Sequence, residues 1–298
     1  MAKVVFIGLG NMGGPMAINL LKAGHQVTGF DLSEAAVKRH RDAGGQTAAT
    51  IGDAVAQADT VVTMLPAGKH VKSVYLGEDG LLSRCAKSAV LIDSSTIDVE
   101  SARAVAAEAE KADVRMVDAP VSGGVGGAEA GSLTFMVGGP DAAFAAAKPY
   151  LDIMGATIVH AGGAGNGQAA KICNNMILGI SMIGVSEAFV LAEKLGLDHQ
   201  KLFDISSTAS GQCWSLTTYC PVPGPVPTSP ANREYQPGFA AAMMLKDLKL
   251  SQDAASASGA VTPLGAEASA LYNLFCANGH AGDDFSGIIN FLRGVKQD

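Results

Sequence analysis

The chain has 298 residues, of which 48% are hydrophobic and 16% charged, and its formal net charge at pH 7 is −7. A chain of this length is expected to form two domains, each with a core of its own. The apolar fraction excludes a disordered chain. The acidic balance argues against general binding to nucleic acid or to anionic membranes. We therefore expect a globular protein of two domains without a nucleic-acid partner.

Three features favour a cytoplasmic location. A strand-like run, Val4 to Ile7, begins almost at the first residue and leaves no room for a signal peptide. The five cysteines are odd in number, widely spaced and without a CxxC pair, which is typical of free thiols in a reducing compartment. The most apolar later stretch, Met176 to Val185, is too short to span a membrane, so we expect no membrane partner.

The N-terminal half alternates predicted strands and helices. The predicted strands cover residues 4–7, 26–30, 61–65, 90–93, 115–119, 134–137 and 157–159. The predicted helices between them cover residues 15–23, 35–43, 102–112 and 141–151. Such alternation indicates a mostly parallel, doubly wound sheet with helices on both faces. Residues 1–163 are therefore expected to form a Rossmann-type α/β domain.

After Gly163 the pattern changes to helical segments alone, and no strand is predicted as far as residue 298. Residues 168–195 predict one helix of roughly 42 Å, at about 1.5 Å per residue. A helix of this length would join the two domains. Residues 164–298 are expected to form an all-α domain for substrate binding and oligomerisation.

A Gly-x-Gly-x-x-Gly motif follows the first predicted strand. Its residues are Gly8, Leu9, Gly10, Asn11, Met12 and Gly13, and Asp31 follows the second strand. In this context the first two glycines form the turn and admit a diphosphate, while Gly13 lets the helix pack closely on the strand. The N-terminus of the helix stabilises the phosphates. A carboxylate at Asp31 would bind the ribose hydroxyls and repel a 2′-phosphate, so we expect NAD as the cofactor.

Three further loops follow predicted strands, at residues 64–66, 94–96 and 120–124. Each lies where a doubly wound sheet binds ligands. Ser122, Gly123 and Gly124 offer a hydroxyl and successive N–H groups, which suit an anionic carboxylate. Taken singly, each loop is better interpreted as an ordinary turn between strand and helix.

Candidate chemistry lies on two predicted helices. Lys171 and Asn175 are one turn apart, with Asn174 beside them. Lys171 among apolar neighbours could act as a general acid or base, and an exposed structural lysine is an equal alternative. For Lys246 and Asp247, contacts to cofactor or substrate compete with a solvated helix face. No cluster of His, Cys, Asp and Glu predicts a metal site.

Four motifs, in order, resemble those of the β-hydroxyacid dehydrogenase family over essentially the whole chain. They are Phe6-Ile7-Gly8-Leu9-Gly10-Asn11-Met12-Gly13, Asp118-Ala119-Pro120-Val121-Ser122-Gly123-Gly124, Gly167-x-x-x-Lys171-x-x-Asn174-Asn175 and Lys246-Asp247-Leu248. The resemblance implies a dinucleotide-binding domain, an all-α domain and an active site between them. It also implies a homodimer or homotetramer built largely through the helical domain.

The resemblance implies roles for individual residues as well. Those expected to line the nicotinamide side are Leu65, Pro66, His70 and Thr96, with Lys246 also near the cofactor. Those expected to hold the substrate carboxylate are Ser122, Gly123 and Gly124, assisted by Asn175. Lys171 would be the catalytic base. Asn174, Asp247 and Trp214 are further candidates for contacts to the substrate.

The reaction that the resemblance implies is NAD-dependent oxidation of a small 3-hydroxy acid, (S)-3-hydroxyisobutyrate, to methylmalonate semialdehyde in valine breakdown. One segment departs from close relatives, because Val222 stands where they often carry Trp. A pocket of different size is expected, and L-serine, tartronate semialdehyde and succinic semialdehyde are the alternative substrates. A non-catalytic module that binds NAD or a partner is the alternative from another class. The presence of Lys171, Ser122 and Asn175 favours an enzyme.

Overall fold

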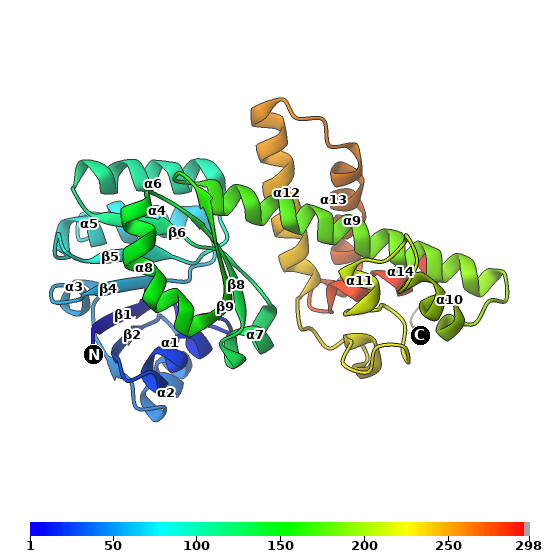
Figure 1. Cartoon of the computed structure of the whole chain (residues 1–298), viewed down its shortest axis with the longest axis horizontal. Helices are drawn as coiled ribbons and strands as arrows, with labels where there is room; N and C mark the ends of the chain where they lie inside the picture. The colour runs from blue at the N-terminus through cyan, green and yellow to red at the C-terminus, as the bar shows by residue number, and fades with distance from the viewer. Residues whose placement is uncertain (295–298) are drawn as a thin grey trace. The chain divides into compact units, whose positions relative to one another are not determined.

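The computed structural model describes residues 1–294, which divide between Lys171 and Ile172 into two compact units (Figure 1). A nine-stranded sheet forms the centre of the first unit, in the order β3-β2-β1-β4-β5-β6-β8-β7, with β9 paired to β8. The strands are β1 (Lys3–Ile7), β2 (Gln26–Phe30), β3 (Gln46–Thr47), β4 (Thr60–Thr63), β5 (Val90–Asp93), β6 (Arg115–Asp118), β7 (Val121–Ser122), β8 (Leu133–Gly138) and β9 (Gly155–Gly162). Strands β1 to β6 run parallel, whereas β8 is antiparallel to β6 and β7. The predicted mostly parallel sheet is confirmed.

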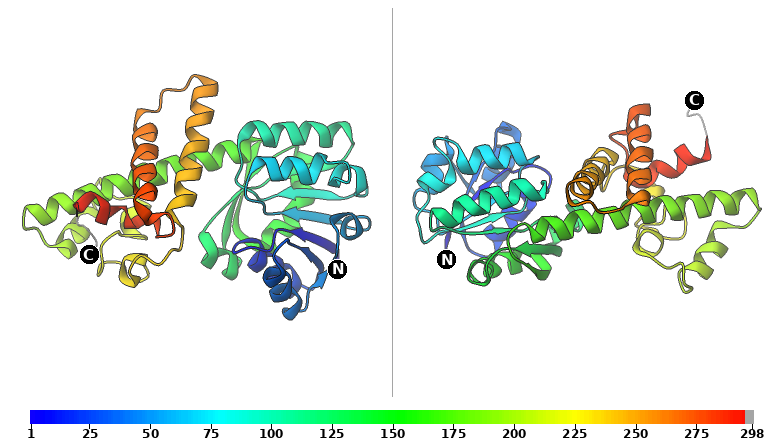
Figure 2. Two further views of the ribbon diagram at one scale, coloured as in Figure 1. Left: turned by 180° about the vertical axis from the view of Figure 1, so that it is seen from behind. Right: turned by 90° about the horizontal axis from the view of Figure 1, so that it is seen from above.

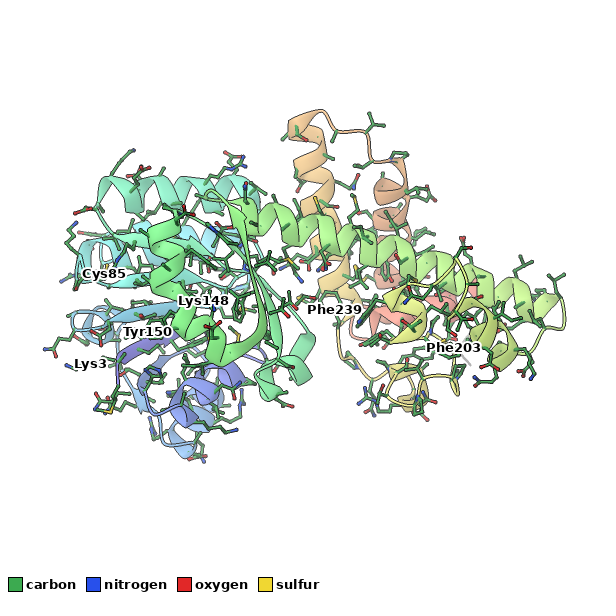
Figure 3. All side chains as sticks on the ribbon, in the orientation of Figure 1. Lys3, Cys85, Lys148, Tyr150, Phe203 and Phe239 are labelled. Carbon is green, nitrogen blue, oxygen red and sulfur yellow. The ribbon has the colours of Figure 1, made fainter. Side chains whose placement is uncertain are left out.

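Helices cover both faces of this sheet, because successive strand residues point to opposite sides. Val4 and Phe6 of β1 belong to one core cluster, and Val5 and Ile7 belong to another. The helices that contribute to the first cluster are α1 (Gly13–Lys22), α2 (Glu34–Asp42), α7 (Gly124–Ala130) and α8 (Asp141–Met154). Those that contribute to the second are α3 (Ile51–Val55), α4 (Gly68–Leu76), α5 (Leu81–Arg84) and α6 (Val99–Lys111). Tyr150 of α8 lies against His25, with ring centroids 5.6 Å apart (Figure 3).

Six elements of the first unit were not expected from the sequence, namely β3, β7, α3, α4, α5 and the seven-residue α7, in which three residues are glycine. Four of them have two to five residues. That length is too short for the period of a strand or a helix to be visible. The nine residues of α4 bury one side of the helix through Val71 and Tyr75, and its charged and small residues obscure that pattern.

The second unit is helical, as predicted. Residues 163–294 contain no strand and only one isolated bridge, between Ala240 and Asp284. The unit contains most of α9 (Asn166–Lys194), together with α10 (His199–Ser206), α11 (Trp214–Thr217), α12 (Ala241–Ser258), α13 (Pro263–Phe275) and α14 (Ile288–Arg293). Figure 2 shows α9 as one continuous helix. Its first six residues belong to the first unit, so the division falls eight residues after Gly163.

The 29-residue α9 is long and apolar enough to cross a membrane by length and composition, and core helices of soluble proteins pass the same test. The apolar stretch identified in the sequence, Met176 to Val185, is therefore shorter than the apolar helix in the structure. Within its most apolar window, 39% of the residues are buried in the chain. Ile177 and Leu191 are instead exposed, at 64% and 59%.

Val222 is fully buried in a core cluster of the second unit that includes Phe189 and Leu216. Phe203 of α10 packs against the same cluster (Figure 3). The side chain at position 222 therefore fills the interior of the unit and borders no open surface. The expectation that Val222 changes the size of a substrate pocket is not supported by this position.

Candidate active site

The glycine motif connects β1 to α1, and its three glycines have different surroundings. A Cβ atom at Gly8 would lie 2.2 Å from the carbonyl oxygen of Met64, and one at Gly13 would lie 1.9 Å from that of Gly8. Only glycine is compatible with such close approaches. Gly10 is exposed, and a Cβ there would meet no atom within 4 Å. Gly8 and Gly13 thus shape the turn, while the backbone at Gly10 is open to a ligand.

Asp31 follows β2 and contacts the glycine loop directly. One carboxylate oxygen accepts a hydrogen bond from the Leu9 N–H at 2.6 Å, and the other accepts from the Ser33 N–H at 2.7 Å. The Leu9 side chain is buried in the core, which leaves the backbone of Leu9 for any contact with a cofactor. Asp31 remains half-exposed. An open glycine loop at the start of α1 with a carboxylate beside it fits a dinucleotide, whose diphosphate and ribose would lie there.

The loops after β4 and β5 are joined by a buried polar network. The Ser95 hydroxyl accepts from the Leu65 N–H at 2.8 Å and donates to Asp93 at 2.6 Å. The Asp93 carboxylate also accepts from the Thr63 hydroxyl at 2.7 Å. In the same two loops Pro66 is exposed and Thr96 is half-exposed. The predicted nicotinamide loops are therefore held in one arrangement, which leaves both residues accessible to a ligand.

The pKa of Asp93 is raised to about 6, chiefly by burial and also by the negative charge of nearby Asp118. Hydrogen bonds from Ser95 and Thr63 act in the opposite direction. Both carboxylates end adjacent parallel strands, with Asp93 and Asp118 in register. Burial raises the pKa of Asp118 as well, against backbone N–H groups that lower it.

The start of α9 is tied to the end of β6. The Asp118 carboxylate accepts from the N–H groups of Gly165 at 2.7 Å and Gln168 at 2.9 Å. Lys171 follows three residues after Gln168 and is 7% exposed. An exposed structural lysine is therefore excluded. Burial of a lysine at the carboxyl-end edge of the sheet is consistent with the expected acid–base role.

Ser122 ends β7, and Gly123 precedes α7. Gly123 is exposed and Ser122 half-buried. The hydroxyl and the following backbone are thus accessible for an anion, as the sequence suggests. His70, by contrast, is exposed in the first turn of α4, and its N–H binds the carbonyl of Ala67 at 2.9 Å. No hydrogen bond described for residues 1–294 connects its ring to the cofactor loops.

In the second unit, polar residues of α9 and α12 form a chain of contacts. The Asn175 amide donates to the Asp247 carboxylate at 2.5 Å, and the Asn174 amide donates to the Asn175 oxygen at 3.0 Å. The Lys246 ammonium lies 3.4 Å from the other Asp247 oxygen. Asn175 and Asp247 are buried, and Asn174 is exposed. Asp247 therefore orients Asn175, and Lys246 belongs to the same group.

Trp214 also lies in the second unit and is 49% exposed. Its ring stacks on Tyr219 at 4.9 Å between centroids. The Tyr219 hydroxyl donates at 2.8 Å to Asp284, a fully buried carboxylate that also accepts from the N–H groups of Gly238 and Phe239. Trp214 thus presents an accessible ring on a rigid base, which suits contact with a small ligand.

Residues 1–294 contain neither a cluster of metal ligands nor a disulfide. No group of three or more His, Cys, Asp or Glu side chains in that range could hold a metal ion. All five cysteines fall within the range and are free thiols. Sequence reasoning missed Asp93, Asp118 as a helix anchor, and Gln168, and it gave Ser95 no role beyond its place in the loop at residues 94–96. Asp118 and Gln168 both lie inside the quoted motifs, which is the one signal that could have indicated them.

Comparison with known proteins agrees with this geometry. Residues 3–163 match the family described as the NAD binding domain of 6-phosphogluconate dehydrogenase. Residues 165–292 match the family described as the NAD-binding region of NADP-dependent 3-hydroxyisobutyrate dehydrogenase. The first unit therefore binds a nicotinamide dinucleotide, NAD or NADP.

Full-length relatives are similar over nearly their whole length. A probable 3-hydroxyisobutyrate dehydrogenase of Mycobacterium tuberculosis is 50% identical over 98% of both chains. The 3-hydroxyisobutyrate dehydrogenase of Pseudomonas aeruginosa is 51% identical over 99% of both chains. A solved structure of the Mycobacterium tuberculosis enzyme with L-serine matches with a TM-score of 0.94, covering 98% of this chain and 99% of that one.

The buried Asp93 predicts a pH-dependent stability. Its folded pKa of about 6 exceeds the unfolded value of 3.8, so between these values the folded chain holds a proton that the unfolded chain has lost. The free energy of unfolding should therefore fall, relative to that of Asp93→Asn, as pH rises from 3.8 to about 6, and the difference should stay constant above that window. Urea denaturation of both proteins across this pH range measures the difference in their free energies of unfolding. Asp253→Asn, at an exposed position of α12, is the control. A difference that does not change with pH would contradict the assignment.

Proposed function

Because this chain belongs to the 3-hydroxyisobutyrate dehydrogenase family, we propose that it oxidises (S)-3-hydroxyisobutyrate to methylmalonate semialdehyde with NAD, a step of valine breakdown. Family membership makes the chain an NAD-dependent hydroxyacid dehydrogenase. The observation that carries the choice of chemistry is the burial of Lys171, at 7% exposure, within the quoted motif. A binding module without catalysis would have no need for a buried lysine there.

In this proposal Lys171, in its neutral form, takes the proton of the substrate hydroxyl. Bound NAD would supply the hydride acceptor, so that the carbon carrying this hydroxyl would become an aldehyde. In the reverse direction the Lys171 ammonium returns the proton to the developing alkoxide. The Ser122 hydroxyl and the N–H groups of Gly123 and Gly124 hold the carboxylate of the substrate. Asn175, oriented by Asp247, assists in binding.

L-serine is the second candidate substrate, because the solved structure of the Mycobacterium tuberculosis relative contains it. L-serine and 3-hydroxyisobutyrate share a primary alcohol and a carboxylate, and they differ in an ammonium against a methyl group. The same base and carboxylate site would therefore serve both. Tartronate semialdehyde and succinic semialdehyde each carry an aldehyde and a carboxylate, so they are the alternatives for the reducing direction of the same reaction.

NAD is favoured over NADP by Asp31. Its carboxylate is half-exposed next to the glycine loop, where a 2′-phosphate would meet a like charge. Positions 32 and 33 are Leu and Ser, so no arginine follows directly to offset this repulsion. We also infer a cytoplasmic enzyme, which the free thiols support.

A panel of substrates and both coenzymes tests this proposal. We expect the highest kcat/KM for (S)-3-hydroxyisobutyrate with NAD, and a lower value with NADP because of Asp31. The panel should include L-serine, with the two semialdehydes assayed in the reducing direction. A higher kcat/KM for L-serine would replace the proposed substrate while leaving the reaction class intact.

Lys171→Ala should lower kcat by about 10²- to 10⁴-fold, the contribution typical of a positioned acid–base group. NADH binding, followed by fluorescence titration, should persist. Lys194→Ala removes an exposed lysine at the other end of α9 and should leave kcat unchanged. Near-normal turnover in Lys171→Ala would remove Lys171 from the mechanism.

A homodimer or homotetramer is proposed as well, supported by Ile177 and Leu191, large apolar side chains of α9 that are mostly exposed. Burial against a second copy would remove this surface from water. Light scattering should give a mass of at least twice the 30.2 kDa of one chain, and Leu191→Asp should lower it. A mass of one chain at micromolar concentration would overturn the proposal.

A further inference from the structure

The Gln168 side chain makes two hydrogen bonds to the backbone on either side of Thr96. Its carbonyl oxygen accepts from the Ile97 N–H at 3.1 Å, and its amide nitrogen donates to the Ser95 carbonyl at 2.7 Å. The residue is completely buried. Gln168 thus binds the carbonyl before Thr96 and the N–H after it, as a neighbouring strand would.

This contact restricts the loop at its most accessible residue. Ser95 and Ile97 are buried, whereas Thr96 is half-exposed. Ser95 is also held from its own side chain, through Leu65 and Asp93. With the backbone fixed on both sides, Thr96 has little freedom to change conformation.

Gln168 is itself fixed at the start of α9. Its N–H donates to the buried Asp118 carboxylate at 2.9 Å. Lys171 is three residues further along the same helix, on the same side as Gln168 by the helical period. One side chain therefore connects the loop that carries Thr96 to the helical turn that carries Lys171.

We propose that Gln168 is a positioning residue that holds Thr96 against the nicotinamide of the bound cofactor. It also fixes the position of Thr96 relative to Lys171. The part that concerns Lys171 rests on the proposed function, and the part that concerns cofactor binding rests on the place at the nicotinamide that the resemblance implies for Thr96. Gln168 touches neither cofactor nor substrate in this proposal, and it acts through the backbone of residues 95–97.

A buried glutamine that serves stability alone is the alternative, and the two make different predictions. Without Gln168, the Ser95 carbonyl and the Ile97 N–H would lose their partners, and the loop would move to recover them in water. A stability role changes the melting temperature and nothing in the folded enzyme. A positioning role also changes cofactor affinity and the rate of hydride transfer.

Gln168→Met is the decisive variant, because methionine keeps the length and volume but makes neither hydrogen bond. We expect the Kd of NADH, by fluorescence titration, to rise about tenfold. With the best substrate of the panel, kcat should fall by up to about 100-fold. The primary isotope effect, with deuterium on the hydroxyl-bearing carbon, should increase because hydride transfer becomes more rate-limiting.

Asn166→Ala is the matched control. Asn166 begins α9 and donates to the Ala161 carbonyl at 3.0 Å, so its loss perturbs the same helix start without touching residues 95–97. Its NADH Kd and isotope effect should equal those of the unaltered enzyme. If Gln168→Met fails to fold, Gln168→Glu keeps the volume and the acceptor for Ile97, and changes in the same direction are expected.

A lowered melting temperature with unchanged NADH Kd and isotope effect would overturn the proposal. Because NADH binding is measured without substrate, this outcome is separate from any failure of the proposed function. Normal turnover in Lys171→Ala would refute the base, yet a weakened NADH affinity in Gln168→Met would still support the role toward Thr96.

Discussion

The hydrogen bonds from the start of α9 to the Asp118 carboxylate are the constraint on which the candidate site depends. They leave the first N–H groups of the helix satisfied inside the protein, where no water is available. The approach is so close that a Cβ at Gly167 would lie 2.4 Å from the Met136 carbonyl oxygen. The first turns of α9 therefore belong to the first unit, although most of the helix belongs to the second. Lys171 and Gln168 owe their positions to this attachment.

Aspartates at the ends of parallel strands share one structural task. Asp31 accepts from the Leu9 N–H, Asp93 from the Ser95 N–H, and Asp118 from the start of α9. In each case a carboxylate orders the backbone of a loop at the carboxyl-end edge, where a doubly wound sheet binds its ligand. Charge-assisted hydrogen bonds to these buried or half-buried carboxylates thus order the loops. The loops still leave Gly10, Pro66 and Thr96 at least partly exposed to solvent.

Periodicity and glycine spacing predict the sheet, the helical second unit and the long helix, because these depend on residue types in regular order. The buried network around Asp93 and Gln168 depends on which side chains meet between segments 30 to 73 residues apart in sequence, and a single sequence holds no such pairing. Lys171 illustrates the same difference: its neighbours left burial and exposure equally open, and only packing decides between them. The burial of Val222 could not be foreseen for the same reason, since this residue of a Pro-rich loop lies in a core cluster.

The net charge of −7 does not describe the surface alone, because some of the acidic residues that it counts are buried. At least four of the 28 acidic residues are buried, namely Asp93, Asp118, Asp247 and Asp284. Burial of a carboxylate is unfavourable unless hydrogen bonds replace its hydration. Each of these four accepts such bonds from loop backbone or from a site side chain. These acidic residues therefore shape the interior of the protein and contribute little to its charged surface. One of them, Asp247, lies 3.4 Å from the Lys246 ammonium, so a count of charges does not show which groups are paired inside the protein.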